Sequence, residues 1–150
     1  MIEFQVLGMP QQRGSKTAHT IRNRNGEIVK RANGSAVVVM RDQNDSKSRP
    51  WMDACKYAAN KAMDRRPLIA GAVELRVTFY FPRPASHFGS GRNAGQLKAK
   101  APEYHTTSPD LDKLVRCLGD ALTKVVWVDD RQVQRILAVR EWTTGAACTE

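Results

Sequence analysis

Five aspartates lie between residues 110 and 130 of a chain that is otherwise strongly basic, with a formal net charge of +9. Asp110 and Asp112 are two positions apart, and Asp129 and Asp130 are adjacent. Carboxylates at positions i and i+2 of an extended or turn segment point the same way, so Asp110 and Asp112 could share one cation. Mg²⁺ commonly binds one or two carboxylates together with water and substrate phosphate. A third acid, from Asp129 or Asp130, would complete such a site, and Mn²⁺ could substitute for Mg²⁺.

A purely structural role accounts for some of the same residues. Aspartate is favoured at a helix N-terminus by the helix dipole, and Asp112, Arg116 and Asp120 have the i, i+4 spacing of a solvated polar stripe. Between residues 110 and 130, however, five Asp face three Lys or Arg, a local balance of 3 − 5 = −2. Clustered like charges are costly unless a cation compensates them, which favours the metal hypothesis.

The charge of the whole chain indicates a polyanionic partner. Lys and Arg outnumber Asp and Glu by 24 to 15, and the pI is about 9.9. Residues 8–49 carry nine Lys or Arg and three Asp or Glu, a balance of 9 − 3 = +6. A metal ion beside nucleic acid indicates phosphodiester hydrolysis, in which Arg116 or Lys113 could stabilise the transition state.

Basic residues in two loop segments are candidates for contacts with the DNA backbone. The first loop offers Arg13 and Lys16, and a long loop offers Arg92, Lys98 and Lys100. The alternative is that these side chains are ordinary solvated loop charges. Contacts with phosphate would make the affinity depend on salt concentration, whereas solvated charges would not.

The elements that must position the acids follow from hydrophobic periodicity. Apolar residues recur at helical spacing over 111–123 and 51–63, with Pro50 in the first turn of the second segment. Strict alternation predicts a strand over 72–81, and shorter strands are expected at 2–6, 27–30 and 36–40, with a turn at Asn25-Gly26. Residues 132–141 are expected to form a last strand or two short elements. The segment 125–128 is a short apolar run. The segment 83–108 is a long Gly-rich basic loop, a feature that is usually functional or mobile.

These elements predict one α+β, or mixed α/β, domain over residues 1–150, with a mixed sheet and two main helices. No apolar run reaches the length of a membrane helix, and the segment "MIEFQVLGMP" lacks the pattern of a secretory signal, so we expect a cytoplasmic protein without membrane contact. The three cysteines are far apart and suggest packed thiols rather than a disulfide or a zinc site.

The segment "DLDKLVRCLGDALTK", followed by "VVWVDDRQV", closely resembles the signature of the RusA family of Holliday-junction resolvases. The opening "VLGMPQQRGSK", the strand ending "FYFPRPASH" and the basic loop before "PDLD" occur in the family's order. The resemblance therefore spans most of the chain. It implies a RusA-like fold and a magnesium-dependent endonuclease. Family members of this kind are often carried by phages or prophages. Such an enzyme acts as a homodimer on four-way DNA junctions and makes paired symmetric nicks.

The resemblance also assigns roles. The family's metal-binding acids fall on Asp110, Asp112 and Asp130, and Asp129 occupies the adjacent acidic position. The family's catalytic lysine falls on Arg116, which keeps the charge but not the ability to donate a proton near neutral pH. Lys113 stands where the best-known members have asparagine and could take over the lysine's role.

Two other functions remain open from the sequence alone. A non-catalytic junction-binding or nucleic-acid-binding protein would use the acids only to cap a helix and to balance nearby arginines. A nuclease of broader specificity would cut flaps and forks as readily as junctions. Trp51, Phe88 and Trp142 could stack at a junction centre, although a tryptophan such as Trp51 is more often part of the core.

Overall fold

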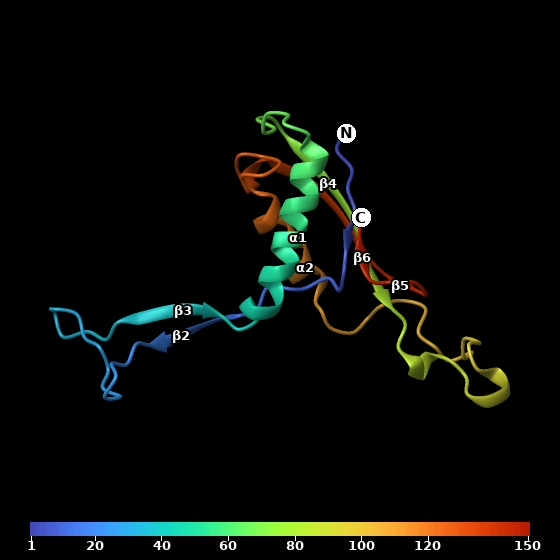
Figure 1. Ribbon diagram of the computed structural model, residues 1–150, viewed down its shortest axis with the longest axis horizontal. Coiled ribbons are helices and arrows are strands. Elements are labelled where there is room, and N and C mark those ends of the chain that lie inside the picture. The colour runs from blue at the N-terminus through green and yellow to red at the C-terminus, as the bar shows by residue number, and fades with distance from the viewer.

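The computed structural model describes residues 1–150 and consists of a body and a projecting arm (Figure 1). The body holds a four-stranded sheet and two α-helices, and the arm is a separate two-stranded sheet. The fold is α+β, as the sequence predicts. The strands are β1 (Val6–Leu7), β2 (Lys16–Thr20), β3 (Val38–Asp42), β4 (Val73–Pro82), β5 (Val133–Thr143) and β6 (Cys148–Thr149). The α-helices are α1 (Asp45–Met63) and α2 (Leu111–Leu122), and the 3₁₀ segments are η1 (Ala85–His87), η2 (Gly91–Asn93) and η3 (Asp130–Gln132).

The sheet of the body has the strand order β1-β6-β4-β5, with β4 and β5 parallel and the other pairs antiparallel. The predicted alternation in β4 buries Val77, Phe79 and Phe81 on the face that carries the core. Parallel neighbours require a crossover, and the connection from β4 to β5 contains the long loop and α2. The direction of β5 therefore depends on α2, and β5 forms one edge of the sheet.

Helix α1 begins six residues earlier than the predicted range 51–63, and Pro50 lies inside it rather than in its first turn. Proline lacks an N–H, so at this position it removes one intrahelical hydrogen bond close to the N-terminus. Ser48 and Cys55 are fully buried on this helix. Burial on both sides of Pro50 therefore continues the helix through a residue that the sequence pattern placed at its start. Trp51 is 5% exposed and belongs to the core.

Helix α2 matches the predicted range 111–123 closely, because five of its twelve residues are buried along one face. The predicted strand over 2–6 is shorter in the structure. Only Val6 and Leu7 pair, because their partner β6 is two residues long. The apolar run 125–128 forms a turn that buries Val126 and Trp127 in the core. Cys55 and Cys117 are buried free thiols, and Cys148 is free and partly buried.

The arm projects from the body and pairs β2 with β3 in antiparallel register, from Lys16 opposite Asp42 to Thr20 opposite Val38 (Figure 1). The predicted strand at 36–40 is thus shifted to 38–42 and pairs with β2. The predicted strand at 27–30 forms only isolated bridges. The turn at Asn25-Gly26 is confirmed, with Gly26 in the left-handed region at φ 83°. A second turn at Asn33-Gly34 returns the chain to β3.

The long loop 83–108 contains η1 and η2 and single bridges, such as that between Phe88 and Leu97. It extends from the body on the side opposite the arm (Figure 1). Neither α-helix has the length and hydropathy that a membrane crossing requires.

Candidate active site

The start of α2 is held from two sides by polar side chains that come from other elements. The backbone N–H of Asp110 donates to Oε1 of Gln12, at 2.7 Å. The guanidinium of Arg140, on β5, donates to the carbonyl oxygens of Thr107 and Pro109 at 2.8 and 2.7 Å. These bonds fix the residues immediately before the helix. The backbone therefore presents Asp110 as the N-cap residue and Asp112 in the first turn.

The two acids at this end differ in their surroundings. Asp110 makes no capping bond with its side chain and instead pairs with Lys113, with 2.7 Å between Nζ and Oδ2. The hydrogen bond and the charge of Lys113 lower the pKa of Asp110, and Asp110 raises the pKa of Lys113 in return. Asp112 is exposed and has no ion-pair partner. The start of α2 therefore offers one free carboxylate and one that a lysine holds.

The second acidic pair lies in the turn before β5. Asp129 caps η3 and accepts hydrogen bonds from the backbone N–H and from Nε of Arg131, at 2.9 and 2.8 Å. These contacts with Arg131 lower the pKa of Asp129. Asp130 is exposed and makes no ion pair. Of the two neighbours, Asp130 is thus the one whose carboxylate is not committed to a salt bridge.

One chain does not bring the two acidic pairs together. Helix α2 has twelve residues, so its ends are about 18 Å apart. After α2 the chain turns at η3, and β5 runs back until Arg140 reaches the start of α2. Figure 1 shows the loop before α2 and the turn after it at opposite ends of the body. No group of three or more His, Cys, Asp or Glu side chains is arranged to hold a metal ion. The expected convergence of Asp110, Asp112 and Asp130 is therefore absent within a single chain.

The polar face of α2 carries Arg116, which is exposed and free of any ion pair. The predicted stripe continues to Asp120, but that carboxylate is bound by Nε of Arg13 at 2.9 Å. Arg13 also reaches Asp42 in the arm, at 3.5 Å, and its backbone N–H donates to the carbonyl of Lys113. Arg13 thus connects the first loop, the arm and α2. Contact between Arg13 and DNA phosphate, which the sequence suggested, would compete with two carboxylates.

The other candidate DNA-binding residues are exposed and lie on projecting segments. Lys16 is on β2 of the arm, and Arg92 is in η2 of the long loop. Lys100 is exposed, whereas Nζ of Lys98 donates to the carbonyl of Ser86 at 2.9 Å. The arm and the long loop extend on opposite sides of the body, so these cations are spread widely (Figure 1).

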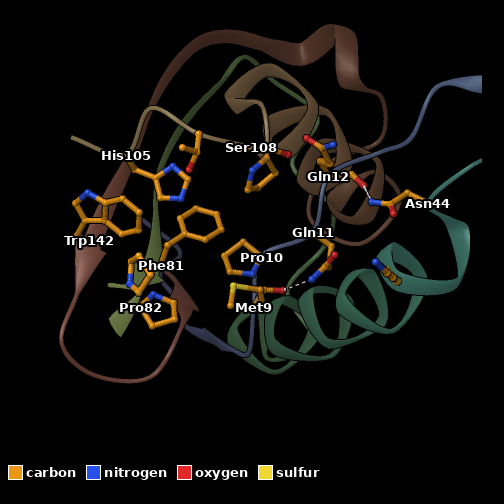
Figure 2. A pocket seen from close by; sticks show the side chains of 14 residues that line it. Met9, Pro10, Gln11, Gln12, Asn44, Phe81, Pro82, His105, Ser108 and Trp142 are labelled. Carbon is orange, nitrogen blue, oxygen red and sulfur yellow. Dashed lines mark hydrogen bonds between the residues drawn. The ribbon is translucent and has the colours of Figure 1, made fainter. Parts of the chain in front are cut away.

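A pocket of about 480 Å³ opens beside the start of α2. Figure 2 shows Gln11, Gln12 and Asn44 on one side of it and an aromatic group on the other. In that group the ring of His105 lies 4.4 Å from Phe81 and 4.3 Å from Trp142, between ring centroids. Burial and the charge of Arg140 lower the pKa of His105. The pocket thus joins a polar wall and an aromatic wall, and its lining includes Pro109, the residue before Asp110.

Sequence reasoning missed three residues that hold the site in place. Gln12 and Arg140 fix the start of α2, and Gln132 fixes the turn that carries Asp130. Oε1 of Gln132 accepts from the backbone of Val128 and Asp129, and Nε2 donates to the carbonyls of Ile69 and Gly71. For Gln132 a sequence signal was available: Asp129 is followed three residues later by Gln132, which is the spacing of a capping box.

Comparison with known proteins places the chain in a family. The family model described as Endodeoxyribonuclease RusA matches residues 21–148, which include α2, η3 and the long loop. The chain is also similar to a protein of Bacillus subtilis (strain 168) named Uncharacterized protein YqaN. The two are 33% identical over 137 residues, which cover 88% of this chain and 81% of the relative. Arg13 and Lys16 lie outside the range of the family match.

Proposed function

Because the chain belongs to the RusA family of endodeoxyribonucleases, we propose that it is a magnesium-dependent nuclease that resolves four-way DNA junctions as a homodimer. The observation that carries this proposal is the exposed acidic start of α2 in a chain of net charge +9. Exposed carboxylates in a basic protein suit a site where a cation and a phosphodiester meet. The enzyme would act on DNA in the cytoplasm and cut two strands symmetrically.

The donor chemistry of the start of α2 fits Mg²⁺, with Mn²⁺ as a substitute. Asp110 and Asp112 supply the hard oxygen ligands that these ions prefer, and their position at the molecular surface leaves room for water and phosphate. The bound ion would lower the pKa of a water molecule and offset charge on the phosphate. Lys113 would have to leave Asp110 for that carboxylate to bind the ion. The released ammonium would then be available to a phosphate oxygen.

Arg116 has the position of a group that stabilises charge. It lies one turn after Asp112 on the exposed face of α2, and no carboxylate occupies its guanidinium. A planar guanidinium can bind two phosphate oxygens at once, but it keeps its proton in proteins and is therefore not a proton donor. We assign Arg116 to electrostatic stabilisation and leave proton transfer to the leaving oxygen to Lys113 or to solvent.

The homodimer would supply the third acid. Asp130 is at the far end of α2 in its own chain, so the carboxylate that completes the site at Asp110 and Asp112 would come from a second copy. A dimer would then hold two identical sites, which suits paired nicks on a symmetric junction. Asp129 would keep its capping role, because Arg131 already holds its carboxylate.

The substrate would rest on the projecting segments and on the pocket. Lys16, Arg92 and Lys100 are exposed and can bind phosphates away from the acids. Lys47 lines the pocket beside the start of α2, and its ammonium suits a nucleotide close to the cut. Arg13 would contribute indirectly, by holding the first loop against α2 through Asp120.

The test is a magnesium titration of nicking on an immobile four-way junction, with Asp112→Asn beside the wild type. Cleavage should fall by more than about a hundredfold in the variant, because even the outer partners of metal ligands contribute tenfold to hundredfold. Junction binding should persist or strengthen, because one negative charge is removed. The matched control is Asp53→Asn on α1, an exposed carboxylate whose partner Lys56 lies at 3.4 Å. Unchanged cleavage in Asp112→Asn would refute the catalytic assignment.

Two results would favour the other functions. Binding of the junction without any cleavage, with Mg²⁺ or Mn²⁺, would indicate a non-catalytic junction-binding protein, which the absence of a three-acid cluster in one chain also allows. Equal cleavage of junction, fork and flap would indicate a nuclease of broader specificity. Preferential cleavage of the junction over the fork and the flap, with symmetric incisions, would support junction resolution.

A further inference from the structure

The outer edge of β5 is a long, regular and unpaired strand edge. β5 pairs only with β4, and from Arg135 to Thr143 the register between them is continuous. Outside the sheet, no backbone hydrogen bond involves residues 134–142. The register shift, with Gln134 as the extra residue, is confined to the start of the strand. Natural proteins shield such edges with proline, charged side chains, bulges or a covering segment. After Arg135, β5 has no proline, lysine or bulge, and its charged residues are Arg140 and Glu141 near its end.

Half-exposed apolar side chains accompany this edge. Ile136 and Leu137 are each 49% exposed, and Val139 is 46% exposed. Ala138 pairs with Val77 and Arg140 pairs with Phe79, so the even-numbered residues of β5 share the face of the buried side chains of β4. Leu137 and Val139 therefore lie on the opposite face, as do Arg135 and Glu141. That face bears an apolar pair flanked by one basic and one acidic residue.

We propose that a second copy of the chain pairs with this edge, β5 against β5, antiparallel and centred on Ala138. In this register Arg135 lies opposite the partner's Glu141, and Leu137 lies opposite the partner's Val139. Each contact occurs twice because of the two-fold axis. Directly opposite residues of an antiparallel pair interact, through both opposite charges and apolar contact. The two sheets would join into one sheet of eight strands.

Neighbouring registers match the charged and apolar residues of the two strands less well. Directly opposite residues in an antiparallel pair point to the same face, so the axis must pass a residue position rather than fall between two. Centring on Leu137 places Arg135 opposite the partner's Val139. Centring on Val139 places Leu137 opposite the partner's Glu141. Of these three registers, only the one centred on Ala138 matches both the charges and the apolar residues.

The charges at the edge are available for this contact. Within the chain, Arg135 shares Glu74 with Arg76, so two guanidinium groups face one carboxylate. Glu141 makes no ion pair. An acid on the partner opposite Arg135 would give that guanidinium a second carboxylate, and a base opposite Glu141 would give Glu141 an ion pair. This charge complementarity identifies the occupant as another copy of the same strand rather than an unrelated partner.

The pairing also has a consequence for the active site, and this step rests on the proposed function. An antiparallel partner places the beginning of its β5, which follows its η3, at the end of this chain's β5. Arg140 holds the start of α2 near that end. The partner's Asp130 would then lie at the same end of the body as Asp110 and Asp112, on the side from which a third acid is needed.

The test uses charge reversal and mixing. Arg135→Glu and Glu141→Arg should each weaken self-association by about tenfold or more in sedimentation equilibrium, since each creates two repulsive pairs per dimer. An equimolar mixture of the two variants should form a heterodimer with an affinity near that of the wild type, because both cross-strand pairs are then attractive. Arg66→Glu, an exposed site without an ion pair, is the matched control and should leave association unchanged.

The outcomes separate this interface from the nuclease assignment. A monomeric wild type, or single variants that dimerise as well as the wild type, would overturn the pairing whatever the cleavage result. Single variants that remain monomeric after mixing, while folded by circular dichroism, would overturn it as well. Heterodimer formation without cleavage by any dimer would support the interface and refute the proposed function instead.

Discussion

Replacing Gln132 with alanine should destabilise the fold more than replacing a glutamine that makes a single exposed hydrogen bond. The amide of Gln132 makes four hydrogen bonds, of 2.7 to 2.9 Å, that connect η3 to the segment before β4. Two of these bonds are partly buried, those to the Asp129 N–H and to the Ile69 carbonyl, and the other two are exposed. Partly buried bonds contribute about 1 kcal/mol each, whereas water can replace the exposed ones. We therefore expect the free energy of unfolding to fall by about 2 kcal/mol.

The assay is urea unfolding followed by circular dichroism, with Gln134→Ala as the matched control. Gln134 makes one exposed hydrogen bond, 3.2 Å long, to the carbonyl of Arg131, so its removal should cost less than about 0.5 kcal/mol. The Gln132→Ala variant should also melt about 4 to 8 °C lower than the wild type. If the two variants were equally stable, the bridging role of Gln132 would be wrong.

A second variant separates the two halves of the Gln132 amide. Gln132→Glu keeps the acceptor for the N–H groups of Val128 and Asp129 but turns a carboxylate oxygen toward the carbonyls of Ile69 and Gly71. Two attractive contacts become repulsive, so Gln132→Glu should be at least as unstable as Gln132→Ala at neutral pH. A variant as stable as the wild type would show that the donor half contributes nothing.

Three further predictions concern charge. Lys113→Gln should raise the pKa of Asp110 toward its usual value, as measured by carboxyl NMR titration, because Lys113 is the main cause of its lowering; an unchanged pKa would contradict the ion pair. The lowered pKa of His105 means that the folded chain binds fewer protons than the unfolded chain just below the ordinary value of about 6.5. Its contribution to stability is therefore complete above about pH 6.5 and is lost as the pH falls toward the lowered pKa, and His105→Phe should flatten the melting temperature between about pH 7 and 5. Lys100→Gln should reduce the slope of log affinity against log salt by about one if Lys100 binds a DNA phosphate, whereas the slope would stay unchanged if Lys100 is a solvated bystander.

The elements that the sequence predicted well are those specified by local periodicity. The alternation in β4 and the apolar stripe of α2 are properties of consecutive residues, and both elements form almost as predicted. The predicted beginning of α1 was wrong by six residues because Pro50 is a local signal, and the burial of Ser48 in the preceding turn outweighs it. The two-residue β1 depends on the length of β6, at the other end of the chain. No local pattern contains that length.

The candidate site shows the same division between local and long-range information. The sequence predicted a metal-binding role for Asp110, Asp112 and Asp130, which stays a prediction, and the structure places all three at exposed positions. It did not identify Gln12 or Arg140, because their partners are backbone groups 98 and 31 to 33 positions away. A side chain that binds backbone from another element has no motif of its own.

The separation of the acids follows from α2 acting as a rigid spacer. Its twelve residues are hydrogen-bonded from end to end and packed against the core, so no loop movement can bring Asp130 to the start of its own helix without unfolding it. Under the proposed function, either Asp110 and Asp112 suffice to bind the metal ion, or another chain supplies a third carboxylate. Cleavage should distinguish these cases: an activity per chain that is constant on dilution supports the first, and one that falls with the dimer fraction supports the second. Asp112→Asn and Asp130→Asn sharpen the distinction. If the site is shared, each variant alone is inactive and a heterodimer of the two regains one complete site, whereas a site of two carboxylates would leave Asp130→Asn active by itself.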